Sequence, residues 1–380
     1  MPLRIARPGL EDVVVAETRL SSVAGEAGQL ILRGFALEEL AGRAGFEETV
    51  YLLWFGELPG RAQLASFAEE LACRRSLSAE VWQVLQVSAE RKASAMDALR
   101  MAASMLTLDT HLEGQANEQE AGLKLVSVFP AIVAGYARLL QGSEPIPPRA
   151  DFGHAANYLY MLGGEVPGAE RVRAMETYFN TVVDHGLNAS TFTARVIMST
   201  QSDLVSAIVG AIGALKGPLH GGAPGPALDM VFEIGEAARA EVVLRKGMEA
   251  GERFMGFALR VYRVRDPRAD VLAQAAERLY TTAADMKLYE LARHVEAVIL
   301  RLLEEYKPGR KLQTNVEFYT ALLLHGLELR TDWFTPTFAV SRVAGWVAHC
   351  FEQQKQNRLI RPDSEYVGER NRRWRAIEQR

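Results

Sequence analysis

Residues 215–225 read LKGPLHGGAPG and place one histidine, His220, between a proline turn and two glycines. Pro218 fixes one backbone angle, while Gly221 and Gly222 carry no side chain and let backbone N–H groups approach a bound molecule closely. Such a loop can present a histidine to a ligand. An ordinary Gly-rich loop with a hydrogen-bonded histidine has the same pattern, so this segment alone leaves both interpretations open.

The composition is that of a soluble globular protein. Hydrophobic residues make up 48% of the chain and charged residues 24%. Its length of 380 residues is enough for two domains or one large domain. The net charge is −4, and no basic block alternates with aromatic residues as it would on a nucleic-acid-binding surface. We therefore expect no nucleic-acid partner.

The sequence also lacks signals for a membrane or a metal. The N-terminal MPLRIARPGLEDVV contains no apolar signal segment, and the apolar run Leu125–Gly135 is too short to span a bilayer. Cys73 and Cys350 lie far apart, and neither a CxxC nor an HExxH pattern is present. We expect a cytoplasmic enzyme with no membrane association and no metal, and cysteines that are buried, reduced thiols.

Helical periodicity dominates the chain after a β-like piece at Val13–Leu20. One apolar stripe, Phe46–Phe55, stops at Gly56, and Pro59 prevents it from resuming at once. No run of strand signals separates the helices, which argues against a doubly wound sheet. The sequence predicts a mostly α-helical protein, with similar stripes at Ala62–Arg74, Ser94–Leu108, Leu123–Leu140, Ala169–Asp184, Ala269–Met286 and Leu288–Tyr306.

Further segments carry histidine, arginine and glutamate residues beside turns and caps. They are VDHGLNASTFTAR (Val183–Arg195), MGFALRVYRVRDPRAD (Met255–Asp270), TNVEFYT (Thr314–Thr320), FAVSRVAGWVAHCFEQ (Phe338–Gln353) and RPDSEYVG (Arg361–Gly368). Several motifs in a fixed order are more specific than any one of them. Together they resemble the citrate synthase family, including the 2-methylcitrate synthases, over nearly the whole chain.

The resemblance implies an all-α fold with two domains. A large domain would consist of residues 1–218 and 323–380, and a small domain of residues 219–322, with the active site in the cleft between them. It also implies a homodimer with shared active sites, each of which borrows an arginine from the partner.

The resemblance further implies a Claisen condensation of an acyl-CoA with oxaloacetate. A thioester methyl group is a very weak acid, so a carboxylate must take its proton while a donor stabilises charge on the thioester oxygen. By resemblance His220 is that donor and Glu317 stands at the position of the base. The coenzyme A thioester is a co-substrate, and no tightly bound cofactor is expected.

A dicarboxylate is best held by planar, permanently charged groups, which arginine provides. By resemblance Arg268, Arg342 and, from the second subunit, Arg361 bind it, with His185 as a further hydrogen-bond donor.

For coenzyme A we expect contacts from Arg263, Arg265 and Lys311. Taken singly, Arg260, Arg263 and Arg265 could equally be solvated surface charges.

The chain departs from the family pattern at the reacting centre. Where the family reads GFGHRVY, this chain reads GFALRVY, so Leu259 stands in place of a histidine that donates to the keto oxygen. Loss of one such donor typically lowers the rate by about a hundredfold to a thousandfold. Where the family has NVDFYSG, this chain has NVEFYTA, so Glu317 carries one methylene more. Ser94 and Ala95 also replace a His-Pro pair.

Three interpretations follow from these departures. The protein condenses an acyl-CoA with oxaloacetate slowly or with a substitute for the histidine, or it uses a different 2-oxo acid, or it is a non-catalytic protein that binds dicarboxylate and coenzyme A.

Overall fold

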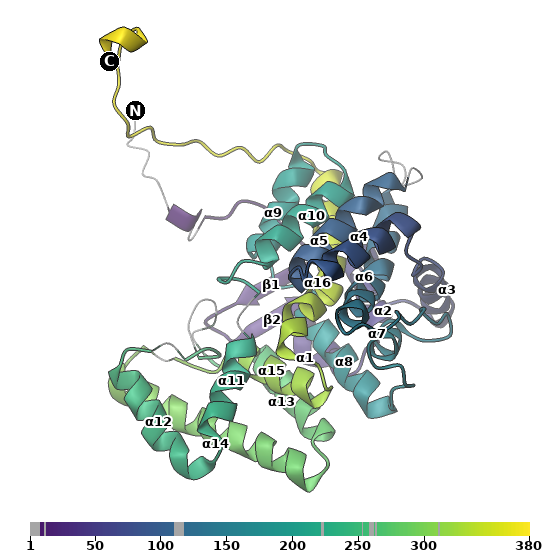
Figure 1. The fold of residues 1–380 in the computed structure, drawn as a ribbon, viewed down its shortest axis with the longest axis vertical. Coiled ribbons are helices and arrows are strands. Elements are labelled where there is room, and N and C mark those ends of the chain that lie inside the picture. Colours follow the sequence, from purple (N-terminus) through teal and green to yellow (C-terminus); the bar gives the residue numbers. More distant parts are fainter. Residues whose placement is uncertain are drawn as a thin grey trace.

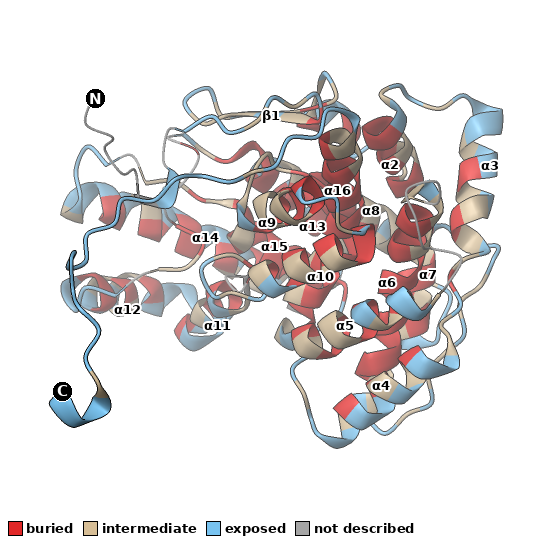
Figure 2. Ribbon diagram, turned by 90° about the horizontal axis from the view of Figure 1, so that it is seen from above, coloured by how far each residue is buried: buried red, intermediate tan, exposed pale blue. Residues whose placement is uncertain are grey.

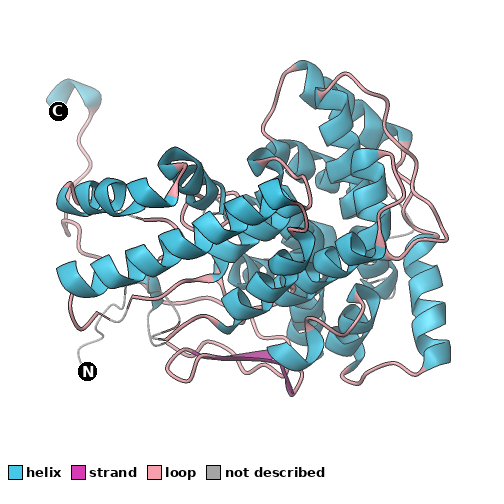
Figure 3. Ribbon diagram, turned by 90° about the horizontal axis from the view of Figure 1, so that it is seen from below, coloured by secondary structure: helices cyan, strands magenta, loops and turns pink. Residues whose placement is uncertain are grey.

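The computed structural model of the protein describes residues 8–10, 13–109, 118–221, 224–252, 254–257, 262, 264–310 and 312–380. Helices make up almost all of its regular structure, as Figures 1 and 3 show. The predicted all-α class is therefore confirmed. The helices are α1 (Leu37–Leu40), α2 (Phe46–Phe55), α3 (Arg61–Ala72), α4 (Ala79–Glu90), α5 (Ala95–Ser104), α6 (Glu118–Leu140), α7 (His154–Gly163), α8 (Ala169–Val182), α9 (Ala189–Ser199), α10 (Leu204–Leu215), α11 (Pro224–Ile234), α12 (Ala237–Glu249), α13 (Pro267–Leu279), α14 (Ala283–Tyr306), α15 (Val316–Gly326) and α16 (Phe334–Lys355).

A small antiparallel sheet lies near the N-terminal end of the described chain. Its strands β1 (Ser21–Ala24), β2 (Gln29–Leu32) and β3 (Phe35–Ala36) pair in sequence order, with Ser21 opposite Leu32. The predicted β-like piece at Val13–Leu20 is wrong, because regular pairing begins only at Ser21. Val14 is 89% exposed, so its β-favouring side chain has no sheet face to pack on.

Helix boundaries follow the sequence punctuation in one place and not in another. Helix α2 ends at Gly56, whose φ of 92° is the left-handed conformation that glycine adopts without strain. The two predicted stripes Ala269–Met286 and Leu288–Tyr306 place a helix boundary at Lys287. This boundary is wrong, because α14 continues through Lys287. The chain leaves the helix earlier, at Tyr280, whose hydroxyl donates to the carbonyl of Leu322 at 2.7 Å.

Two long helices form the centre of the fold, and Figure 2 shows α16 and α6 as largely buried. The run Leu125–Gly135 lies within α6, which is by itself long and apolar enough to cross a membrane. However, 78% of its most apolar 18-residue stretch is buried inside the protein, and the helix packs against α4, α5, α7 and α16. A mostly buried core helix passes the same test, so α6 is explained by packing.

The two cysteines differ in their surroundings. Cys350 on α16 is fully buried, as predicted, and burial raises the pKa of its thiol. Cys73 is exposed at the end of α3, so the prediction that it is buried is wrong. Both are free thiols.

Helix α16 touches the backbone of the segment that follows α8. A Cβ added to Gly345 would lie 2.0 Å from the Val183 carbonyl oxygen and 3.4 Å from the Asp184 side chain. Only glycine allows this approach, because no other residue lacks a Cβ. Polar residues on α16 are thereby held against Asp184 and its neighbours.

We therefore expect Gly345→Ala to destabilise the protein by about 3 kcal/mol or more, since the added methyl group meets rigid backbone. Gly213→Ala is the matched control, because Gly213 lies in α10 and a Cβ added there would meet nothing within 4 Å. That substitution should leave stability unchanged or raise it by up to about 1 kcal/mol. Thermal unfolding of the two variants measures the difference. Equal melting temperatures would show that α16 can move away from Val183.

Candidate active site

His220 is held by a chain of polar contacts from two other segments. Its Nε2 lies 2.7 Å from the hydroxyl of Ser190, the second residue of α9. The indole N–H of Trp346 on α16 donates to the same hydroxyl at 3.1 Å. The ring of Phe338, also on α16, meets the imidazole edge-on at 6.4 Å between ring centres. The protein thus holds the predicted ligand-facing histidine, His220, through its Nε2.

The imidazole of His220 is neutral at pH 7. Burial, and next the positive charge of Arg342, lower its pKa to about 4. A neutral histidine carries one N–H, so it can donate from one ring nitrogen only.

The glycines beside His220 have a different role from the predicted one. The Gly221 N–H donates to the Leu215 carbonyl at 3.1 Å, so it is not free for a ligand, and the expectation is wrong at this position. A Cβ on Gly221 would lie 2.5 Å from the same carbonyl oxygen. Gly221 therefore closes the turn after α10, and Gly222 lies outside the described residues.

Two buried arginines place positive charge close to His185. Arg342 is 1% exposed, and its Nε donates to the Val182 carbonyl at 2.6 Å. Within the described chain no carboxylate comes within ion-pair distance of its guanidinium. Burial, opposed by the charge of Asp184 and assisted by that of Arg268, lowers the pKa of Arg342 to about 10. The cation is thus buried with only partial compensation, which favours an anionic ligand.

Arg268 is compensated from within its own loop. Its guanidinium makes two contacts with the Asp266 carboxylate, at 2.7 and 3.0 Å. Asp266 also caps α13 by accepting from the Arg268 N–H at 3.0 Å. These three bonds fix Arg268 at the first turn of the helix.

His185 lies beside both arginines. Burial and the charges of Arg268 and Arg342 keep the pKa of His185 well below its usual value. Its Nε2 lies 3.0 Å from the Tyr262 hydroxyl. The structure therefore brings together three residues predicted to bind the dicarboxylate, and the histidine among them is neutral.

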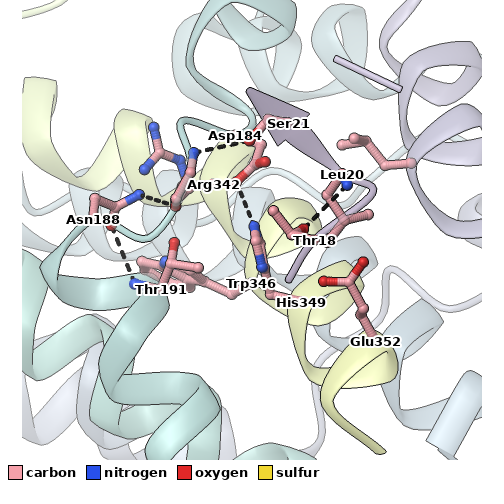
Figure 4. A network of polar contacts seen from close by, with 12 residues as sticks. Thr18, Leu20, Ser21, Asp184, Asn188, Thr191, Arg342, Trp346, His349 and Glu352 are labelled. Atoms are coloured by element: carbon pink, nitrogen blue, oxygen red, sulfur yellow. Dashed lines mark hydrogen bonds and ion pairs between the residues drawn. The ribbon is translucent and has the colours of Figure 1, made fainter. Parts of the chain in front are cut away.

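The segment before α9 is anchored by a buried network that sequence reasoning missed (Figure 4). The Nε2 of His349 donates to Asp184 at 3.1 Å, and Arg195 donates to the other ring nitrogen at 3.1 Å. Arg195 also forms an ion pair with Glu352 at 2.8 Å. Asp184 and His349 are fully buried. The sequence contains one indication of this network: the spacing of residues 342, 346 and 349 places them on one face of a helix.

Glu317 lies in the first turn of α15, where the Asn315 side chain accepts from its backbone N–H at 3.2 Å. Its Oε2 is buried and has no hydrogen-bond partner within the part of the chain described. Burial raises the pKa of the Glu317 carboxyl, and the nearby Arg268 opposes that shift. An unpartnered carboxylate oxygen of raised pKa is able to accept a proton from a ligand.

Other predicted residues lie elsewhere. Arg361 is exposed, in the extended C-terminal segment that leaves the body of the chain in Figure 1. Arg265 pairs with Asp270 at 2.5 Å and with Glu296 at 2.6 Å. Leu259, Arg260, Arg263 and Lys311 lie outside the described residues.

Ser94, at the position of the family's His-Pro pair, caps α5 through its hydroxyl. No three His, Cys, Asp or Glu side chains in the described ranges gather as a metal site requires.

The family model described as "Citrate synthase, C-terminal domain" matches residues 9–363. This chain belongs to the citrate synthase family. Full-length relatives include the citrate synthase of Haloferax volcanii, 40% identical and covering 98% of both chains, and citrate synthase 2 of Bacillus subtilis, 40% identical and covering 99% of both. A 2-methylcitrate synthase of Mycobacterium tuberculosis is 38% identical over 96% of this chain and 91% of its own.

Solved structures agree with this assignment. The citrate synthase of Thermotoga maritima matches with a TM-score of 0.87 and 38% identity, covering 99% of both chains. A ternary complex of carboxymethyl coenzyme A and oxaloacetate with citrate synthase from Thermoplasma acidophilum matches with a TM-score of 0.90 and 29% identity, covering 98% of both. By family, this citrate synthase-type protein is an acyltransferase.

The low pKa of His220 has a consequence for stability. Between pH 6.5 and about 4 the unfolded chain binds a proton at His220 that the folded chain does not, so stability falls as the pH falls. His220→Gln should lose less stability over that range, by up to about 1.4 kcal/mol per pH unit. Denaturant unfolding at several pH values measures this slope. His294→Gln, at an exposed histidine of α14, is the control, and identical slopes for all three proteins would contradict the assignment.

Proposed function

We propose that the protein condenses an acyl-CoA, acetyl-CoA or propionyl-CoA, with oxaloacetate, at a rate or specificity altered by Leu259 and Glu317. The observation that carries this is a buried cluster, called the pocket below, in which Arg268, Arg342 and neutral His185 lie together and Arg268 also lies near Glu317, one oxygen of which has no partner in the described chain. Two cations and a hydrogen-bonding group match a dicarboxylate. A free carboxylate beside them matches the base that the reaction needs.

In this reaction Glu317 takes a proton from the α-carbon of the acyl thioester. The enolate carbon that results bonds to the keto carbon of oxaloacetate, while the C=O π bond of the keto group breaks and its oxygen takes up a proton to become a hydroxyl. Hydrolysis of the thioester then releases coenzyme A. The raised pKa of Glu317 makes it a stronger base than an exposed carboxylate. Its extra methylene relative to aspartate changes the distance to the α-carbon, and such shifts of about 1 Å can lower the rate by about a hundredfold.

The donor role of His220 requires one particular tautomer. The single hydroxyl proton of Ser190 can go to Asn188 Oδ1, 2.8 Å away, or to His220 Nε2, 2.7 Å away. If it goes to Nε2, the imidazole carries its own proton on Nδ1 and can donate it to the thioester oxygen. The proposed function uses this arrangement, with Trp346 donating to the same hydroxyl.

The remaining features of the family are carried over as part of the proposal. The protein is a cytoplasmic homodimer in which Arg361 reaches the partner's site. The small domain, residues 219–322, closes over the substrates and excludes water. Arg263, Arg265 and Lys311 contact coenzyme A, although Arg265 would have to leave its two carboxylate partners or bind with its remaining N–H groups.

The dicarboxylate pocket can be tested without turnover. Oxaloacetate at millimolar concentration should raise the melting temperature of the wild type, because it binds the native state. Arg342→Met should lose this shift while the ligand-free protein melts at a similar temperature, since removing a poorly compensated buried cation offsets the lost bond to Val182. Arg301→Met, at an exposed arginine, should keep the shift. An unmoved wild-type melting curve would refute dicarboxylate binding.

Catalysis is tested by release of free coenzyme A from acetyl-CoA or propionyl-CoA with oxaloacetate and other 2-oxo acids. Wild type should turn over oxaloacetate slowly, and Leu259→His should raise the rate, more so together with Glu317→Asp. The two effects should not be additive, because both residues act on one transition state. Turnover of another 2-oxo acid alone supports the altered-substrate interpretation. If the double variant binds oxaloacetate but stays inactive, the binding-protein interpretation is favoured.

A further inference from the structure

A buried glutamate on α14, Glu296, joins the two segments, each a loop with the first turn of the helix after it, that carry Arg268 (residues 264–270) and Glu317 (residues 312–320). These segments are called the two loops below. It is 5% exposed. Its Oε1 accepts from the Thr314 hydroxyl and from Arg265, each at 2.6 Å, and its Oε2 accepts from the Tyr319 hydroxyl at 2.5 Å. One carboxylate thus binds three side chains from two segments far apart in sequence.

Each partner of Glu296 is close in sequence to a residue of the pocket. Thr314 and Tyr319 lie three residues before and two residues after Glu317. Arg265 directly precedes Asp266, the carboxylate that holds Arg268. A shift of Glu296 would therefore be transmitted to both loops over a few bonds.

Backbone contacts show that the two loops also meet directly. The Asp266 N–H donates to the Thr314 carbonyl at 3.4 Å, which is a long bond. The Asn315 N–H donates to the Gly256 carbonyl at 2.9 Å. Glu296 adds three side-chain bonds to these backbone contacts and to the packing of α13 on α15.

We propose that Glu296 is a positioning residue that sets the distance between the base Glu317 and the dicarboxylate-binding Arg268. It touches neither substrate and acts through Thr314, Tyr319 and Arg265. This inference rests on the proposed function for the roles of Glu317 and Arg268, while the loop organisation it describes does not. Because substrate and base must lie within a fraction of an ångström of the reactive geometry, such a residue acts mainly on turnover.

Glu296→Gln is the variant that tests this, because it keeps the shape of the side chain and removes its charge. An amide offers one acceptor oxygen, so it cannot accept all three hydrogen bonds. Glu290→Gln is the matched control, with the same substitution on the same helix at an exposed site. Tyr319→Phe is a milder second variant that removes a single donor to Glu296 and serves if the glutamine variant folds poorly.

The first readout is hydrogen–deuterium exchange of the ligand-free protein, which needs no activity. In Glu296→Gln, peptides covering residues 264–270 and 312–320 should exchange at least several-fold faster than in wild type, while peptides from α6 should not change. The control should match wild type throughout. Unchanged exchange in both loops would overturn the proposal.

The second readout is turnover of acetyl-CoA with oxaloacetate. Glu296→Gln should lower kcat by about tenfold or more, with a smaller change in KM, and its effect should be non-additive with Glu317→Asp. A purely structural role would instead give additive effects, and that result, or unchanged kcat, would overturn the proposal even with faster exchange. If wild type has no turnover, the proposed reaction fails, and oxaloacetate affinity becomes the test: it should weaken in Glu296→Gln, and an unchanged affinity overturns the role of Glu296.

Discussion

The close contact between Gly345 and the Val183 backbone sets how α16 packs on the segment that carries His185. At this contact the space between α16 and the backbone of Val183 is too small to hold a methyl group. Arg342 lies one turn before Gly345 and His349 one turn after it, so both reach the junction of α8 and the segment after it from the same helix face. Arg342 bonds to Val182 and His349 to Asp184. The close packing at Gly345 thus fixes the position of the Arg342 guanidinium and of the hydrogen bond between His349 and Asp184.

Electrostatics explains why this arrangement is suited to a ligand and poorly suited to an empty core. Arg342 is buried without a close carboxylate, whereas Arg268 is fully paired with Asp266. The charge of Arg268 adds to the effect of burial in lowering the pKa of Arg342, and burial together with both arginines keeps His185 neutral. Burying such charges is unfavourable unless an anion compensates them. The dicarboxylate of the proposed function would supply the missing charges and accept hydrogen bonds from the remaining N–H groups, and its binding would relieve this electrostatic cost.

Sequence analysis predicted the helical class and the residues that carry charge, and it failed where tertiary contacts decide. Periodicity and a glycine stop gave α2 correctly, because both signals are local. The break at Tyr280 was missed, since a bond to Leu322 on another helix terminates α13. Gly221 was assigned to ligand contact, but its N–H is bonded to Leu215 within the turn. His349 and Trp346 were missed as well, although their spacing from Arg342 was visible, because only the folded chain shows which helix face meets Asp184.

Glu317, one of the departures from the family pattern, is held in place by hydrogen bonds on both sides. Glu317 keeps its place in the first turn of α15 through Asn315, and Glu296 holds the residues on either side of it. Buried polar groups are costly once their partners go, so these bonds hold the start of α15 in one arrangement. Within that arrangement one Glu317 oxygen has no hydrogen-bond partner in the described chain. The same fold that fixes the backbone of Glu317 therefore leaves its carboxylate able to accept a proton, which is what the proposed reaction requires of it.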